Sequence, residues 1–278
     1  MNPPDGFRHV DERADPGQLV EYLDDTRRFP VLREVDRWLA VELRLIRGSR
    51  VLDIGCGTGE DTVELAALVA PDGCAVGLDT SEVMVHVARR RAAGRGLPVE
   101  FRTGRTEALD LPDGDYDACR FERVLHHLTS PTAALSEAAR VLRPGGRLAA
   151  FEPDWTSLAI TGASPAVTRE VLGMRSTAFE SPDVGARLSH LVAEAGFGDV
   201  RHHEVHLETT SLHVAVRAFR LESDVEAAVA VGAVSSEAAI AWCETLAAAD
   251  RAAAFSAQVR GHLVCGTRLA GWSTPASS

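Results

Sequence analysis

Three glycines at alternate positions, Gly55, Gly57 and Gly59, follow an apolar run that contains Asp53 and ends at Ile54. Because glycine has no Cβ, the backbone can turn sharply here and a ligand can approach the amides at the head of the next helix. The apolar run and the helical spacing after the glycines predict a strand, a tight loop and a helix. This loop is the first candidate for a ligand site.

The charges around the loop distinguish between two kinds of nucleotide-like ligand. Asp53 precedes the glycines, and Glu60 and Asp61 follow them. A pyrophosphate binds best at a helix N-terminus that presents amides and cations, so carboxylates here favour a cationic ligand. The spacing agrees, because Glu60 stands where a dinucleotide fingerprint has its third glycine. NAD, and with it a dinucleotide-dependent oxidoreductase, is therefore the weaker interpretation.

The run from Asp53 to Gly59 resembles the first motif of the class I S-adenosylmethionine-dependent methyltransferases, whose cofactor carries an ammonium and a sulfonium group. Three later stretches resemble further motifs of the methyltransferase type 11 branch, which includes the ubiquinone and menaquinone biosynthesis enzymes: 109–117, 124–128 and 141–148. The resemblance extends over about 47–153. It implies S-adenosyl-L-methionine as cofactor and S-adenosyl-L-homocysteine as product.

The resemblance also assigns residues to the cofactor. Asp79 closes the second expected strand and is similar to the family's ribose-hydroxyl ligand. Arg105 follows Gly104 where the family usually has an acidic or amide residue that meets the adenine amino group, and arginine has only donors. The adenine contact is therefore expected at Thr106, Glu107 or the backbone. The full expected set is Asp53, Gly55, Cys56, Gly57, Gly59, Asp79, Thr80, Met84, Gly104, Arg105, Thr106, Glu107 and Glu122.

Methyl transfer from a sulfonium mainly requires orientation, but a neutral hydroxyl or amine acceptor also needs a base. His126 and His127 follow the fourth expected strand, and Asp154 lies at the end of the fifth. We favour His126 as the base, with Asp154 as its orienter or as a second base, because consecutive helical residues point about 100° apart. His127 is the other catalytic candidate. The alternative is that this turn only packs against the sheet.

Acceptor contacts are expected at Tyr22, Arg123, His127 and Trp155. In similar methyltransferases an N-terminal helix like the one that carries Tyr22 closes the substrate pocket, although packing at a helix interface is the alternative. Long apolar cap segments predict a bulky, partly hydrophobic acceptor, such as a secondary metabolite, methylated on O, N or activated C. A cyclase or isomerase that binds the cofactor without transferring its methyl group would have the same loop and stays open.

The elements that position these residues follow from the apolar pattern. Strands are expected at 50–54, 75–79, 99–103, 116–121 and 147–152, and helices between them at 59–69, 81–93 and 132–142. This alternation predicts an α/β, doubly wound, Rossmann-like sheet with its ligand cleft at the carboxyl ends of the strands. Strands near 200–207 and 258–266 complete a mostly parallel sheet of seven, with an antiparallel last strand as in the family.

Helical segments are expected around this core. Residues 1–46 predict an N-terminal helical cap that begins with a mobile lead-in over 1–18. The core is assigned to 47–153 and 183–270. Segments 154–182 and 213–251 show helical patterning without a strand pattern, so they are expected to be helical inserts on the substrate side.

Composition limits the expected partners. The net charge of −11 argues against nucleic acid, and no uncharged run approaches the roughly 18 residues of a membrane span. The N-terminus lacks an apolar leader, so we expect a cytoplasmic monomer or homodimer that acts on a small molecule. No metal is expected, because the cysteines lack C-x-x-C spacing and a strand puts His203 on the face opposite His202 and His206. The arginines at 89–91, together with Arg95, are expected to form a solvated helix face.

Overall fold

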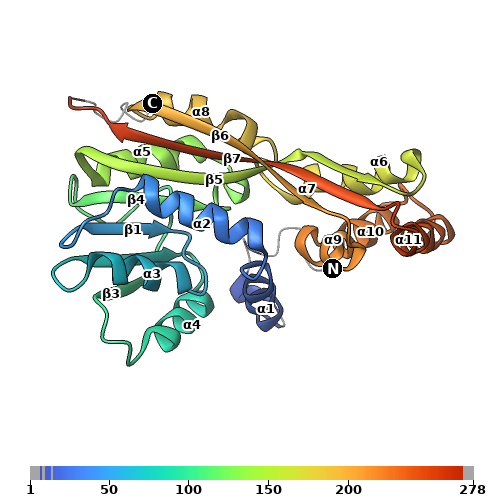
Figure 1. Ribbon diagram of the computed structural model, residues 1–278, viewed down its shortest axis with the longest axis horizontal. Coiled ribbons are helices and arrows are strands. Elements are labelled where there is room, and N and C mark those ends of the chain that lie inside the picture. Colours follow the sequence, from blue (N-terminus) through green and yellow to red (C-terminus); the bar gives the residue numbers. More distant parts are fainter. Residues whose placement is uncertain (1–6, 8–9, 14, 272–278) are drawn as a thin grey trace.

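The computed structural model describes residues 7, 10–13 and 15–271. Seven strands form one sheet in the order β3-β2-β1-β4-β5-β7-β6 (Figure 1). The strands are β1 (Arg50–Ile54), β2 (Cys74–Asp79), β3 (Val99–Thr103), β4 (Tyr116–Glu122), β5 (Leu142–Thr161), β6 (Phe197–Thr209) and β7 (Ser256–Arg268). The first five pair in parallel, and β7 is antiparallel to both β5 and β6. This confirms the predicted sheet, including the antiparallel last strand.

Helices cover both faces of the sheet because successive strand residues face opposite sides. Val51 belongs to the core under α2 (Pro30–Glu42) and α3 (Glu60–Val69), whereas Leu52 packs under α5 (Pro131–Val141) and α8 (Val184–Glu194). The helix α4 (Glu82–Ala92) begins where Ser81 Oγ accepts a hydrogen bond from Met84 N at 3.1 Å. Ser81 is therefore the N-cap of α4. Within the described part of the chain, every helix is too short or too polar to cross a lipid bilayer.

The strand β5 is much longer than predicted, which corrects the expected helical insert over 154–182. It continues to Thr161, which pairs with Ser256 of β7 after an irregularity between Asp154 and Ala159. Only the second half of that segment is helical, with α6 (Pro165–Gly173) and α7 (Arg175–Ala178). The sequence did not reveal the extension, because its backbone partners lie about 100 residues away in β7 and its apolar pattern is interrupted by polar residues.

The strands β5, β7 and β6 thus extend beyond the parallel part of the sheet as a three-stranded arm (Figure 1). Helices α6, α9 (Leu212–Phe219), α10 (Leu221–Ala230) and α11 (Ser236–Arg251) lie at the far end of this arm (Figure 1). The helix α1 (Gly17–Thr26) reaches α9, because Tyr22 Oη donates a hydrogen bond to the carbonyl of Ala218 at 3.2 Å. The arm therefore brings α9, which is distant in the sequence, into contact with α1.

The lead-in predicted over 1–18 is only partly described, since 1–6, 8–9 and 14 lie outside the described residues. Val10–Glu12 form a short 3-10 helix, η1, and Val10 is buried. Asp11 accepts hydrogen bonds from Ser81 Oγ at 2.5 Å and from Glu82 N at 2.8 Å. A carboxylate at a helix N-terminus is stabilising. This described part is therefore fixed to the start of α4, contrary to the prediction of a mobile lead-in.

Candidate active site

A cavity of about 380 Å³ opens at the carboxyl ends of the parallel strands. From the expected cofactor set it is lined by Gly55, Gly57, Asp79, Thr80, Met84, Arg105, Thr106, Glu107 and Glu122. From the expected catalytic and acceptor sets it is lined by Tyr22, Arg123, His126, His127 and Trp155. Cys56 and Gly59 line a smaller adjoining cavity, and Asp53, Gly104 and Asp154 line neither. The fold therefore gathers most of the predicted residues around one space.

The three glycines of the loop have positive φ angles of 76°, 51° and 82°, which L side chains rarely adopt. A Cβ on Gly59 would lie 2.6 Å from atoms of Ala88 in α4 and Phe101 in β3. This glycine therefore allows the start of α3 to pack closely against these two elements. A Cβ on Gly57 would instead lie 3.1 Å from Leu23, in the wall of the cavity. Gly57 is the glycine whose missing side chain leaves room for a ligand.

Asp79 connects the loop to the end of β2. Its Oδ2 accepts a hydrogen bond from Gly57 N at 2.9 Å, and its Oδ1 accepts one from Ser81 N at 2.9 Å. Burial raises the pKa of Asp79, while these two amide donors oppose the shift. Since a carboxylate has about four lone-pair sites, Asp79 can still accept hydrogen bonds from a ligand in the cavity.

Asp53 and Gly104, which were predicted to contact the cofactor, line neither cavity. Asp53 is 1% exposed, and its oxygens accept hydrogen bonds from Thr62 Oγ1 at 2.7 Å and Arg120 Nη1 at 3.0 Å. It stands directly opposite Arg120 in the pairing of β1 with β4. Gly104 donates its amide to the carbonyl of Asp79 at 3.0 Å. Both residues thus make contacts within the protein next to the cavity and do not line it.

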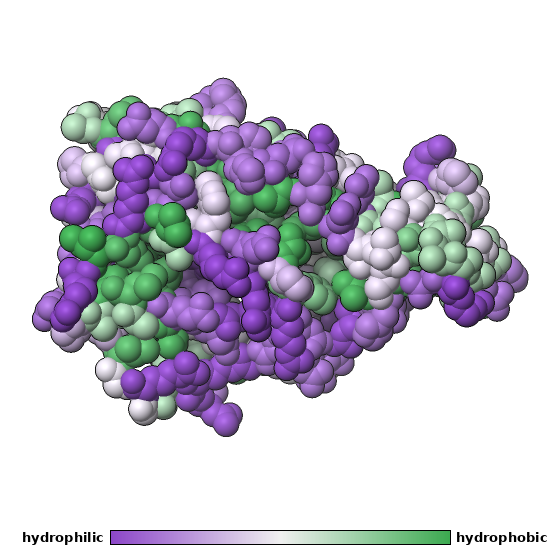
Figure 2. Space-filling view, viewed as in Figure 1, coloured by the Kyte–Doolittle hydropathy of each residue, from purple (hydrophilic) through white to green (hydrophobic). Residues whose placement is uncertain are grey.

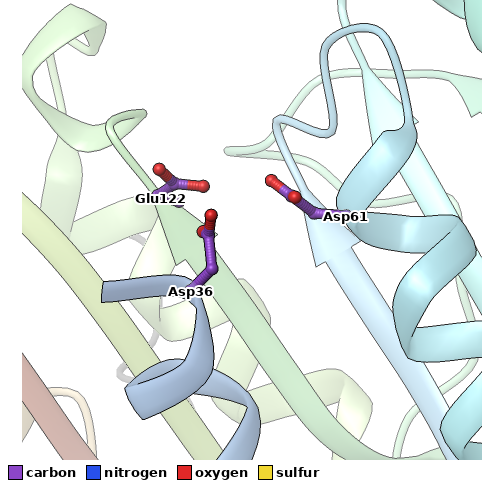
Figure 3. A group of neighbouring side chains, drawn as sticks. All are labelled: Asp36, Asp61 and Glu122. Carbon is purple, nitrogen blue, oxygen red and sulfur yellow. The ribbon is translucent and has the colours of Figure 1, made fainter. Parts of the chain in front are cut away.

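Arg120 is the centre of a buried charge cluster next to the loop. Besides Asp53, its guanidinium donates to Asp36 at 2.8 Å, Asp61 at 3.2 Å and Glu122 at 2.5 Å. Burial opposes its charge, but these carboxylates raise the pKa of Arg120 well above its usual value. Asp36, Asp61 and Glu122 point toward one another with spacing that could hold a metal ion (Figure 3). Arg120 is the cation that they surround here.

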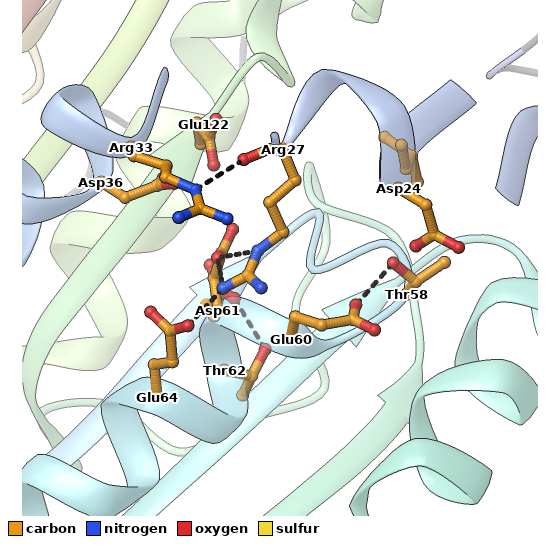
Figure 4. Close-up of polar contacts among 12 residues, drawn as sticks. Asp24, Arg27, Arg33, Asp36, Thr58, Glu60, Asp61, Thr62, Glu64 and Glu122 are labelled. Atoms are coloured by element: carbon orange, nitrogen blue, oxygen red, sulfur yellow. Dashed lines mark hydrogen bonds and ion pairs between the residues drawn. The ribbon is translucent and has the colours of Figure 1, made fainter. Parts of the chain in front are cut away.

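Further arginines fix the N-terminal helices to the loop. Arg91 of α4 bridges Asp24 of α1, at 2.7 Å, and Glu60 of α3. Arg27 donates to Asp61 at 3.0 Å (Figure 4). Arg91 is thus not part of a solvated face, contrary to prediction. Glu60 and Asp61 are both paired with arginines, so their negative charges are balanced within the protein and do not by themselves favour a cationic ligand.

His126 lies in the 3-10 helix η2 (Leu125–His127) and is only 3% exposed. Its Nδ1 is 2.6 Å from Oε2 of Glu152, and Oε1 of Glu152 accepts hydrogen bonds from the amides of Val124 and Leu125, both at 2.7 Å. Burial raises the pKa of Glu152 to about 7, although the amide donors oppose the shift. His126 and Glu152 therefore form a buried pair that can share a proton.

Asp154 is not the orienter of His126, which corrects that prediction. Its carboxylate accepts hydrogen bonds from Thr156 N at 3.1 Å and from Arg260 Nη2 at 3.2 Å. The irregularity in β5 begins directly after Asp154, and Arg260 is its partner in β7. Strand alternation places Glu152 and Asp154 on the same face of β5, so the sequence alone does not show which of them contacts His126. The contacts of Asp154 with Arg260 of β7 decide this.

Aromatic side chains form the end of the cavity beyond His126. Trp155 stacks on Phe179 with ring centroids 5.3 Å apart, and Phe179 also lies 5.4 Å from the ring of His127. The guanidinium of Arg175 lies over the Trp155 ring at 5.0 Å. Phe179, Arg175 and Arg220 line this cavity and were not predicted, because their segments carry no motif. Their helices reach the cavity only through the tertiary structure.

A second cavity of about 400 Å³ adjoins this aromatic end and shares Tyr22, Arg123 and Trp155 with the first. Most of its other walls are apolar and come from α2, β6 and α9, including Phe29, Leu32, Leu207, Val214 and Phe219. Apolar side chains show between hydrophilic ones in this region of the surface (Figure 2). The space next to His126 is thus suited to a partly hydrophobic molecule.

The histidines of β6 lie away from these cavities. The strand is at the edge of the sheet, and His203 and His206 are exposed. His202 Nε2 lies 3.0 Å from Nδ1 of His262, with the two rings stacked. Burial, followed by the neighbouring His202, lowers the pKa of His262. These contacts describe a histidine pair on the sheet surface.

Residues 51–146 match a family model described as a methyltransferase domain. The chain is 37% identical over 244 residues to an uncharacterised 37.1 kDa protein in transposon TN4556 of Streptomyces fradiae, covering 86% of this chain and 69% of that protein. It is 30% identical over 186 residues to a demethylmenaquinone methyltransferase of Listeria monocytogenes, covering 60% of this chain and 78% of that protein. It spans less than two thirds of the length of other curated relatives that it matches.

Among solved structures, the YcgJ protein from Bacillus subtilis superposes with a TM-score of 0.63 at 20% identity. The match covers 86% of this chain and all of that one. At this identity the likeness concerns the fold, and it agrees with the sheet order described above.

Proposed function

This chain belongs to the S-adenosylmethionine-dependent methyltransferases, and we propose that it methylates an oxygen, nitrogen or activated carbon of a small, bulky, partly hydrophobic molecule, such as a secondary metabolite. The observation that carries the proposal is a single cavity in which the glycine loop meets a buried histidine–carboxylate pair and a group of aromatic rings. The apolar second cavity, and a relative named for demethylmenaquinone, support an acceptor built around a ring system.

The residues around the loop fit S-adenosylmethionine. Gly57 leaves its side of the cavity open, and Asp79 retains lone pairs suited to the ribose hydroxyls. Glu107 lies in the cavity wall, where its carboxylate accepts from Thr106 Oγ1 at 3.1 Å and can also accept from the adenine amino group. Glu122 also lines this cavity, where its oxygens are paired with Arg120 and Arg123 but can accept a further hydrogen bond from the ammonium group of the cofactor. When bound, the cofactor supplies a methyl group on a positively charged sulfur.

We assign the role of base to His126 and the role of orienter to Glu152. A carboxylate on Nδ1 fixes the imidazole ring and strengthens it as a base. The proton removed from a hydroxyl or amine of the acceptor can be held on His126 and stabilised by Glu152. Tyr22, Arg123, His127 and Trp155 line the acceptor part of the cavity, where they exclude water and orient the ring system.

The test uses a panel of hydroxylated naphthalenes and quinols with methyl-labelled S-adenosylmethionine, and measures product mass and S-adenosylhomocysteine release. His126→Ala and Glu152→Gln should lower kcat by about 10²–10⁴-fold, because a base in reach of the acceptor contributes that much. Cofactor affinity, measured by calorimetry, should change little. His203→Ala, on the exposed edge strand, is the matched control.

Unchanged turnover in both variants would remove the pair from the mechanism. A product of unchanged mass, formed only with the cofactor bound, would favour the cyclase or isomerase alternative.

We also propose a cytoplasmic location and a monomeric or homodimeric state. All five cysteines are free thiols, which is typical of a reducing compartment. Sedimentation of the purified protein tests the oligomeric state.

A further inference from the structure

Positive charge exceeds negative charge at the aromatic end of the cavity. Arg175 is 4% exposed and forms a salt bridge with Asp224. Arg220 lines the same cavity with its guanidinium 5.8 Å from the Tyr22 ring, and it forms no salt bridge with any residue that the structure describes. Asp224 thus pairs with only one of the two guanidinium groups, although it also lies within the electrostatic range of Arg220.

The arginines at this end are close enough to affect one another. Burial, and then the charge of Arg220, lowers the pKa of Arg13. Burial also lowers the pKa of Arg175, and Arg220 adds to this shift while Asp224 opposes it. Arg220 itself has a left-handed backbone, with φ of 51°, at the junction of α9 and α10. A non-glycine residue held in this conformation is costly and is often found at functional sites.

Buried hydrogen-bond donors at the same end have no partner. Trp155 Nε1 and Arg175 Nε are both buried and unpaired among the described residues, and both residues line the cavity. Nη1 of Arg13, the neighbour of Arg220, is also buried and unpaired. Buried donors are nearly always satisfied in folded proteins. These donors have no accessible surface, so the group in the cavity that an anionic oxygen could pair with is the guanidinium of Arg220.

We propose that the acceptor is an aromatic molecule that carries an anionic oxygen group, such as a carboxylate, and that the guanidinium of Arg220 binds this group. This inference rests on the proposed function, because it concerns the acceptor of the same site. The stacked rings of Trp155 and Phe179 provide the aromatic wall. The group would lie at the end of the cavity away from the glycine loop, so it anchors the acceptor while another atom faces the methyl group.

The experiment compares naphthoate with its neutral amide, naphthamide, by calorimetry on protein saturated with S-adenosylhomocysteine. Binding of S-adenosylhomocysteine is measured first, so that failure of the proposed function is seen separately from failure of this inference. Naphthoate should bind at least about 10-fold more tightly than naphthamide, since a charge-assisted pair in a partly buried site is worth that much.

Three variants distinguish a binding role of Arg220 from a structural one. Arg220→Gln should abolish the preference for naphthoate, and Arg220→Lys should retain part of it because the charge is kept. Arg90→Gln removes the same charge from the exposed face of α4 and should leave the preference unchanged. Equal affinity for the two probes, no binding of either, or a preference that persists in Arg220→Gln would each overturn the inference.

Discussion

Gly57 and Gly94 adopt the same left-handed backbone conformation, with φ of 51° and 77°, but their surroundings differ. A Cβ on Gly94 would meet nothing within 4 Å, whereas a Cβ on Gly57 would enter the cavity wall beside Leu23. The conformational requirement for glycine is thus the same at both positions. Only Gly57 combines it with a place for a ligand.

Replacing each glycine by alanine separates these two contributions. Gly57→Ala and Gly94→Ala should each lose about 1–3 kcal/mol of folding stability, because a non-glycine residue is forced into the left-handed region. Gly57→Ala should also weaken S-adenosylmethionine binding by about 10-fold or more, since its methyl group occupies space that the cofactor needs. Calorimetry at matched temperature checks this. Equal cofactor affinity in the two variants would argue against the loop as the cofactor site.

At the scale of elements, the N-terminal helix α2 is attached to the cofactor loop through charge. Asp36 of α2 shares the Arg120 guanidinium with Asp61 of α3 and Glu122 of β4. Burial, followed by the charges of Glu122 and Asp61, raises the pKa of Asp36 to about 8. The raised pKa favours the protonated form of Asp36, because ionising it introduces repulsion with Glu122 and Asp61 next to the loop.

The folding stability of the protein should therefore depend on the protonation of Asp36, and the direction of this pH dependence can be stated. The folded pKa of Asp36, about 8, lies above its ordinary value of 3.8, so its contribution to stability is full below about pH 3.8 and is lost as pH rises through about 8. In Asp36→Asn the side-chain amide oxygen can still accept a hydrogen bond from Arg120, but the side chain does not ionise. Its stability relative to the wild type should therefore increase between about pH 6 and pH 8, by up to about 1.4 kcal/mol per pH unit.

Thermal or urea unfolding at several pH values measures this difference. Glu34→Gln, on the exposed side of α2, removes the same kind of charge and should show no such trend. A constant difference between Asp36→Asn and the wild type over this pH range would contradict the raised pKa of Asp36.

At the scale of the whole molecule, the cavities are closed by parts that are distant in the chain. The parallel sheet provides the glycine loop, the arm provides Trp155, and the helices at its far end provide Arg220. Contacts such as that of Arg217 with Asp25 join these helices to α1. A ligand that fills the cavity therefore contacts several separate elements at once and should stabilise the whole fold.

Thermal unfolding with added ligands tests this expectation. At a concentration 100 times its Kd, S-adenosylhomocysteine should stabilise the protein by about 2.7 kcal/mol, which corresponds to a rise in Tm of roughly 5–10 °C for a protein of this size. NAD at the same concentration should cause little change. A rise with NAD and none with S-adenosylhomocysteine would contradict the cofactor assignment.

The sequence by itself determined the sheet, the glycine loop and most of the cofactor side of the cavity. These features depend on local spacing: apolar alternation, helical periodicity and glycines at fixed positions all lie within a few residues of one another. The tertiary structure decided the rest. Glu152 rather than Asp154 contacts His126, because the carboxylate of Asp154 pairs with Arg260 of β7. The charge cluster of Arg120 and the aromatic end of the cavity with Arg220 join residues from separate elements, and such contacts exist only once the chain has folded.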